Sequence, residues 1–196
     1  MHFASLAALI VAGLLAGCSQ AEPEAVVTLP PVPEERFTEV PVEPAPIEVS
    51  KAAAKTRDAL IEEATRGSLR GLGEIAARNP DFKSNLGGQS HDQFWDLLRR
   101  TGVDPNRKLR ELFDQPAGLR EIDGQRWYVW PDLAAKDAAD LIPEKLTFHD
   151  RRRLEGLIRE DGIARIRAGE GYPGMRTAIS EDGTWIYFVL GQDGEE

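Results

Sequence analysis

The chain has 196 residues, a net charge of −9 and a single cysteine. Because acidic residues outnumber basic ones, no basic surface for a phosphate backbone is expected, and nucleic acid is not expected as a partner. One cysteine cannot form an intramolecular disulfide, so packing alone must stabilise any folded domain. The sequence contains no Gly-x-Ser-x-Gly nucleophile elbow, which argues against hydrolases of that class.

The first seventeen residues are largely apolar and include no Lys, Arg, Asp or Glu. Their apolar run is shorter than the about 20 residues that a membrane-spanning helix needs, and its length is typical of the hydrophobic region of a secretory signal. The run ends in Leu15-Ala16-Gly17-Cys18, which places one aliphatic and two small residues before the only cysteine. This stretch resembles the lipobox of bacterial lipoproteins.

The resemblance implies a processed and lipid-anchored protein. In that family the signal, here residues 1–17, is removed, the thiol of the cysteine, here Cys18, receives diacylglycerol, and the new amine is acylated, for example with palmitate. Three acyl chains anchor a protein stably, because two already suffice. Ser19 favours the outer over the inner membrane, since aspartate at that position retains members of the family in the inner one. The resemblance therefore implies a periplasm-facing protein of the bacterial cell envelope, held to the membrane through Cys18.

Residues 18–50 are expected to form the lipidated cysteine and a disordered linker. Seven of the thirteen prolines lie between Pro23 and Pro46, and residues 19–50 contain seven glutamates against one arginine. Proline lacks the N–H that regular structure needs, and the glutamates repel one another. At about 3.1 Å per residue in polyproline II form, such a tether reaches roughly 90 Å. Residues 51–196 then hold the remaining net charge of −3 and are expected to form one domain.

The beginning of this domain is helical by the spacing of its apolar residues. Ser50 can cap a helix that runs from Lys51 toward Arg78 with a break near Gly67, and Asn79-Pro80 ends it. After a loop, Ser90-His91-Asp92-Gln93 matches a capping box and predicts the start of a second helical segment. That segment ends at Gly102. A third begins at Asp104-Pro105, and its apolar face is formed by Leu109, Leu112 and Phe113.

Two hairpins follow later in the chain. Residues 119–122 and 125–130 flank Asp123-Gly124, the strongest short hairpin signal. Residues 175–180 and 184–190 flank a second tight turn. The last strand, residues 185–190, is apolar on both faces, so we expect it to be covered on both sides or to lie centrally.

Helical segments separate the two hairpins. Short pieces are expected between Asp132 and Leu146, and Thr147 caps a helix whose apolar spacing continues beyond Gly162 to Ile166, before a loop at residues 169–174. The predicted fold class is therefore α+β, with several helices packed on a small antiparallel sheet built from two hairpins.

The candidate catalytic or metal-binding residues are few. His91-Asp92 and His149-Asp150 resemble metal or phosphoesterase dipeptides, but each is expected in the first turn of a helix, where the helix dipole favours aspartate. Ser90 next to His91 is a weak candidate for a serine nucleophile activated by a histidine base, because neighbouring side chains in the first turn of a helix point apart. The sequence indicates no metal ion, no cofactor and no catalytic set.

Two groups of side chains are candidates for binding. Basic runs at 99–100, 107–110 and 151–153 are expected to be solvated helix faces, with contact to phosphate or carboxylate groups of lipids or wall polymers as the alternative. Aromatic residues on the strands are expected in the core, with a sugar- or peptide-binding face as the alternative. These aromatic residues are Trp127, Tyr128, Trp130, Trp185, Tyr187 and Phe188.

Two functions are compatible with these features. The first is a non-enzymatic, membrane-anchored interaction or accessory domain, whose partner is an envelope protein or a wall polymer. The second is an envelope hydrolase that uses carboxylates, for which Glu121, Asp132 and Glu144 are the candidates. Buried carboxylates with shifted pKa values, converging on a pocket, would favour the hydrolase.

Overall fold

A computed structural model of the chain describes residues 47–84 and 90–191. The expected signal peptide, Cys18 and nearly all of the expected linker lie outside these residues, as do the Gly87-Gly88 loop and the last five residues. The sequence-based expectations for those parts stay predictions.

Four helices form the first half of the described domain: α1 (Lys51–Thr65), α2 (Leu69–Ala76), α3 (His91–Arg100) and α4 (Pro105–Phe113). The expected break near Gly67 separates α1 from α2. Side chains satisfy free N–H groups at three of the four N-termini, since Ser50, Ser68 and Asp104 accept hydrogen bonds from the backbone of the first turn.

The helix start expected at Ser90 is confirmed, but the hydrogen bond that a capping box predicts for the serine hydroxyl is wrong. Ser90 has the extended backbone of an N-cap residue, but its hydroxyl accepts no hydrogen bond from the first turn of α3. Ser90 is exposed, so water can satisfy these N–H groups instead.

The sheet has four antiparallel strands in the order β1-β2-β3-β4, which confirms the α+β class and both hairpins. Its strands are β1 (Gly118–Ile122), β2 (Gln125–Trp130), β3 (Met175–Ser180) and β4 (Trp185–Leu190). The β1–β2 turn has positive φ at both Asp123 and Gly124, as the hairpin signal predicts. A bulge lies between Ala178 and Ile179, where β3 pairs with β4.

The connection between the hairpins consists of η1 (Asp132–Ala135), η2 (Pro143–Lys145), α5 (Phe148–Leu157) and α6 (Glu160–Arg167). Thr147 caps α5 as expected, because its hydroxyl accepts from the Asp150 N–H. The helical spacing expected beyond Gly162 is confirmed, because Ile163 and Ile166 lie in α6, but it belongs to a second helix and not to a continuation of α5. The helix breaks at Ile158, which has extended backbone, and Gly162 lies inside α6. Gly162 is small enough to let α6 approach Pro173.

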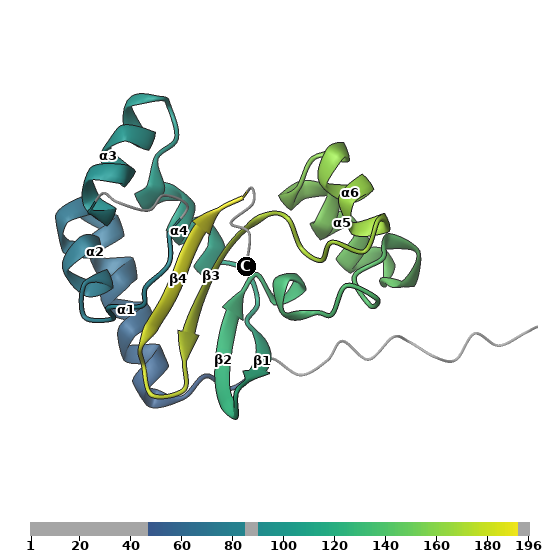
Figure 1. Cartoon of the computed structure of the whole chain (residues 1–196), viewed down its shortest axis with the longest axis horizontal. Coiled ribbons are helices and arrows are strands. Elements are labelled where there is room, and N and C mark those ends of the chain that lie inside the picture. The colour runs from purple at the N-terminus through teal and green to yellow at the C-terminus, as the bar shows by residue number, and fades with distance from the viewer. Residues whose placement is uncertain (1–46, 85–89, 192–196) are drawn as a thin grey trace, which may run out of the picture. The chain divides into compact units, whose positions relative to one another are not determined.

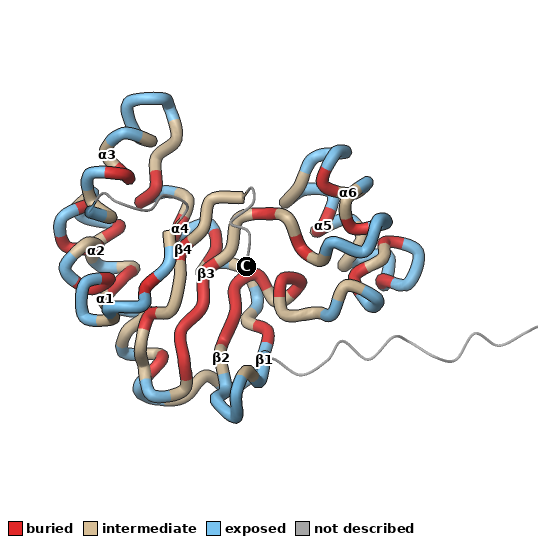
Figure 2. The backbone as a smooth tube through the Cα atoms, in the orientation of Figure 1, coloured by how far each residue is buried: buried red, intermediate tan, exposed pale blue. Residues whose placement is uncertain are grey.

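The sheet separates two hydrophobic cores, as Figures 1 and 2 show. Helices α1 to α4 cover one face, where Trp95, Trp185 and Phe188 are buried. The segment from η1 to α6 covers the other face, where Val129 and Ala178 are buried. Alternation along β2 and β3 decides which core each side chain enters. In β4 the bulge shifts the alternation, so Trp185 and Phe188, three residues apart, enter the same core.

Strand β4 lies at one end of the strand order, with a core on each of its faces. The expected covering on both faces therefore holds, and the central position does not. Its outer edge is partly paired, since the Lys83 N–H donates to the Ile186 carbonyl and the Phe188 N–H donates to the Lys83 carbonyl. This short parallel bridge protects the edge of an apolar strand.

Candidate functional site

A cavity of about 400 Å³ lies between the sheet and the segment that contains α6. Strands β1 and β3 form one wall, the end of η1 and the residues up to 138 form another, and the loop after α6 lines a third side. We call it the cationic pocket. Its ionisable lining residues are Arg120, Lys136, Asp137, Arg165, Glu170, Tyr172 and Arg176.

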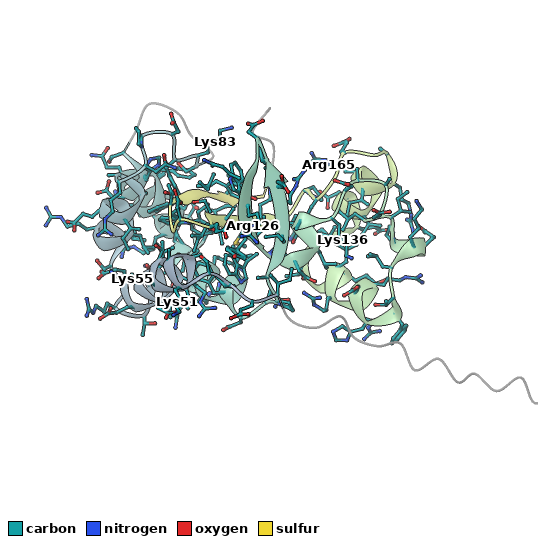
Figure 3. All side chains as sticks on the ribbon, turned by 90° about the horizontal axis from the view of Figure 1, so that it is seen from below. Lys51, Lys55, Lys83, Arg126, Lys136 and Arg165 are labelled. Carbon is teal, nitrogen blue, oxygen red and sulfur yellow. The ribbon has the colours of Figure 1, made fainter. Side chains whose placement is uncertain are left out.

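The charge of the cationic pocket is opposite to that of the domain around it. Four basic side chains line it against two carboxylates, whereas residues 51–196 together have a net charge of −3. Lys136 and Arg165 lie on the side of the sheet that holds α5 and α6, far from Lys51 and Lys55 of α1 (Figure 3). A cavity lined by one sign of charge concentrates ligands of the other sign.

The strand register places two of the arginines on the same face. Arg120 of β1 pairs with Trp127, and Arg176 of β3 pairs with Val189. By alternation, both side chains share the face of Val129 and Ala178, which is the face that α5 and α6 cover. Two strands of the rigid sheet therefore position two guanidinium groups at one cavity.

Internal contacts hold two other parts of the cationic pocket. Nη1 of Arg176 donates to the carbonyls of Tyr172 and Gly174, both at 3.3 Å, which ties β3 to the loop after α6. Nε of Arg165 lies 2.6 Å from Oε2 of Glu170, so α6 and the same loop share an ion pair. These contacts orient the guanidinium groups of Arg165 and Arg176, and a planar guanidinium group matches the planar geometry of a carboxylate.

Tyr172 forms a buried part of the wall and is 8% exposed. Burial raises the pKa of its hydroxyl strongly, although the charge of Arg176 opposes this shift. The phenol therefore stays protonated at physiological pH. It is a neutral hydrogen-bond donor beside the arginines and not a base.

The three carboxylates proposed for a hydrolase lie apart, and none of them lines the cationic pocket. Glu121 is exposed on β1. Asp132 forms a short ion pair with Arg153 of α5, and Arg153 also contacts Asp150. Glu144 is exposed and pairs with Arg167, whose hydrogen bond holds the pKa of this carboxyl below its ordinary value. The structure does not bring these groups together as an acid and base pair.

The two histidine dipeptides lie on opposite faces of the sheet. His149 is exposed in the first turn of α5, whereas His91 packs edge-on against Phe82 at 4.8 Å. Within residues 47–84 and 90–191, no group of three or more His, Cys, Asp or Glu side chains is placed to hold a metal ion.

The partner of His91 is a serine other than the one that sequence adjacency suggested. Oγ of Ser84 lies 2.9 Å from Nδ1 of His91. Burial lowers the pKa of His91, against the charge of Asp92, so the ring is neutral near pH 7. No hydrogen bond in the described part of the chain joins this histidine to a carboxylate. The pair thus lacks the group that orients the base in a nucleophilic site, and it serves to join the residues before α3 to the helix.

The basic runs are for the most part paired at the surface, as expected for solvated helix faces. Arg99 and Arg100 both bond to Asp96, and Arg107 and Lys108 both pair with Glu111. Run 151–153 differs, because Arg153 is only 16% exposed and links α5 to η1 through Asp132.

The strand aromatics divide between core and boundary. Tyr128, Trp130, Trp185 and Phe188 are buried, which confirms the core assignment for these four. Trp127 and Tyr187 are half-buried and face one another at 6.4 Å on the α5–α6 face.

Sequence reasoning missed Arg120, Lys136, Arg165 and Arg176 because it searched for basic runs. These residues are isolated in the sequence and meet only through the fold. One signal was available for Arg176, because alternation along the second hairpin places it on the same face as the buried Ala178, where a charged residue is unusual. Arg120 is exposed on the edge strand β1 and had no such signal.

Comparisons with family models, with curated proteins and with solved structures found no match to this chain. Among the residues that the structure describes, no helix has both the length and the apolar character that a membrane crossing requires. The geometry of the chain itself is therefore the basis for any functional proposal.

Proposed function

We propose that the protein is a lipid-anchored, non-enzymatic binding domain of the bacterial cell envelope. The observation that carries the binding part is the cationic pocket, a cavity with four basic side chains in a domain of net negative charge. The lipobox-like sequence ending at Cys18 supports the anchor. Its partner is an anionic envelope component, either a wall polymer or the acidic surface of an envelope protein.

The composition of residues 19–50 agrees with this proposal. A proline- and glutamate-rich segment favours extended chain, and a tether of roughly 90 Å lets a binding domain reach partners away from the membrane surface. Tethering also raises the local concentration of the domain near envelope ligands, so a pocket of modest affinity suffices.

Replacing Cys18 by serine should move the protein from the membrane fraction to the soluble fraction. A serine hydroxyl does not accept the diacylglycerol, and each buried CH₂ of an acyl chain contributes about 0.8 kcal/mol to membrane binding. Fractionation followed by mass spectrometry of the membrane-extracted chain measures this, with an acyl mass expected on the peptide that begins at Cys18. A Cys18→Ser protein that stays wholly with membranes would contradict the proposed anchor.

The binding part predicts a charge-dependent partner. Replacing both Arg120 and Lys136 by glutamine should reduce crosslinking to envelope components severalfold, because two of the four basic groups are lost. The matched control is Arg107→Gln with Lys108→Gln, which removes the same charge from α4 on the other side of the sheet. Crosslinking in intact membranes and sedimentation with purified cell wall distinguish a protein partner from a polymer. Equal losses in the two double variants would rule out the pocket as the binding site.

A further inference from the structure

The ion pair between Arg165 and Glu170 shows what kind of ligand the cationic pocket accepts. Glu170 belongs to the loop after α6, between Gly169 and Gly171, and its carboxylate reaches back to Nε of Arg165 at 2.6 Å. Both side chains line the cavity. A carboxylate supplied by the protein itself therefore already lies at one guanidinium group of the pocket.

We propose that the cationic pocket binds a carboxylate-bearing ligand, and that Glu170 is a built-in competitor which the ligand displaces from Arg165. This inference rests on the proposed binding function and names its ligand class. An incoming carboxylate takes the place of Glu170 at Arg165 and gains Arg120, Lys136 and Arg176 as further cationic neighbours. Glu170, which is exposed, is then left in contact with water.

The placement of the groups supports this exchange. The Glu170 side chain is 49% exposed and that of Arg165 is 30% exposed, so the pair is in contact with solvent and costs little to open. Arg176 is held by backbone carbonyls and stays in place when Glu170 leaves. Tyr172 lines the same cavity, and its buried phenol stays protonated, so it adds no negative charge that would oppose an incoming carboxylate.

A control is available on the same helix. Arg167, two residues after Arg165, pairs with Glu144 at 2.7 Å, and Glu144 is not part of the cationic pocket. Glu170→Gln and Glu144→Gln thus each remove one carboxylate from an arginine of α6. Only the first removes the proposed competitor.

The experiment is titration calorimetry of the full chain in uncharged detergent at low salt, with glutarate as the probe. Glutarate presents the same terminal carboxyl group as the Glu170 side chain. Glu170→Gln should bind glutarate about two- to fivefold more tightly than the unchanged protein, the size expected from loss of one exposed ion pair. Glu144→Gln should bind it as the unchanged protein does, and the Arg120→Gln, Lys136→Gln variant should bind it more weakly.

Each other result overturns a stated part of the inference. Equal or weaker glutarate binding by Glu170→Gln refutes the competitor role. Tighter binding of inorganic phosphate than of glutarate refutes the carboxylate assignment. If none of the proteins binds glutarate at millimolar concentration, the ligand class is wrong. The proposed function is judged separately, by crosslinking and sedimentation with the charge-matched double variants.

Discussion

Replacing Trp185 by alanine should lower the free energy of unfolding by about 3–5 kcal/mol. The indole is 2% exposed and packs against Phe82, with ring centroids 4.5 Å apart, and against Trp95 at 5.8 Å. Its Nε1 donates to the hydroxyl of Thr177 at 2.8 Å. Truncation leaves a cavity among these rings and removes a buried hydrogen bond, so both packing and polar pairing are lost.

Thermal or urea unfolding measures this effect. At about 2–4 °C per kcal/mol, the melting temperature should fall by roughly 6–20 °C. The lost free energy is a large part of the roughly 5–15 kcal/mol that stabilises a typical domain. The matched control is Phe148→Ala, because Phe148 is 78% exposed at the start of α5 and its truncation should change stability by no more than about 0.5 kcal/mol. A Trp185→Ala protein that melts within about a degree or two of the unchanged one would refute the core assignment.

Replacing Gly183 by alanine should destabilise the domain by about 2–4 kcal/mol. Gly183 has a φ of 91° in the β3–β4 turn, a conformation that costs an alanine energy by itself. A Cβ there would also lie 2.8 Å from the carbonyl oxygen of Ala52 at the start of α1. The turn cannot simply move away, because the hydroxyl of Thr56 donates to the Gly183 carbonyl at 2.6 Å.

Gly124 is the control that separates these two causes. It has a φ of 75° in the β1–β2 turn, but a Cβ added to it would meet nothing within 4 Å. Gly124→Ala should therefore show the backbone cost alone, and the difference between the two variants in urea unfolding should be about 1–3 kcal/mol. Equal losses would mean that the contact between the turn and α1 relaxes without cost.

The elements that sequence reasoning located well are those decided by local chemistry. Asp123-Gly124 specified a two-residue turn, and Asp104-Pro105 and Thr147 specified helix starts, because cap side chains and positive φ act within a few residues. The failures were also local. Ser90 fits the capping pattern, but an exposed hydroxyl competes with water, and the pattern does not report exposure.

Little of the candidate site was predictable in the same way. Runs of basic residues are easy to see in a sequence, yet Arg99, Arg100, Arg107 and Lys108 pair with nearby carboxylates on their own helices. Local pairs of this kind form wherever charges recur at helical spacing. Ser84 and His91 are seven residues apart, and no pattern in the sequence marks them as hydrogen-bond partners.

The sequence by itself determined the α+β class, the two hairpins and most helix starts, because hydrophobic periodicity, caps and turn residues act over short distances. It also supplies the whole argument for the proposed lipid anchor, since that proposal rests on the resemblance of residues 15–18 to a lipobox. Only the tertiary structure decided that β4 lies at an edge with a core on each face. Only it brought Arg120, Lys136, Arg165 and Arg176 from four separate segments to one cavity, because strand register and the packing of α6 on the sheet set distances that no local pattern encodes.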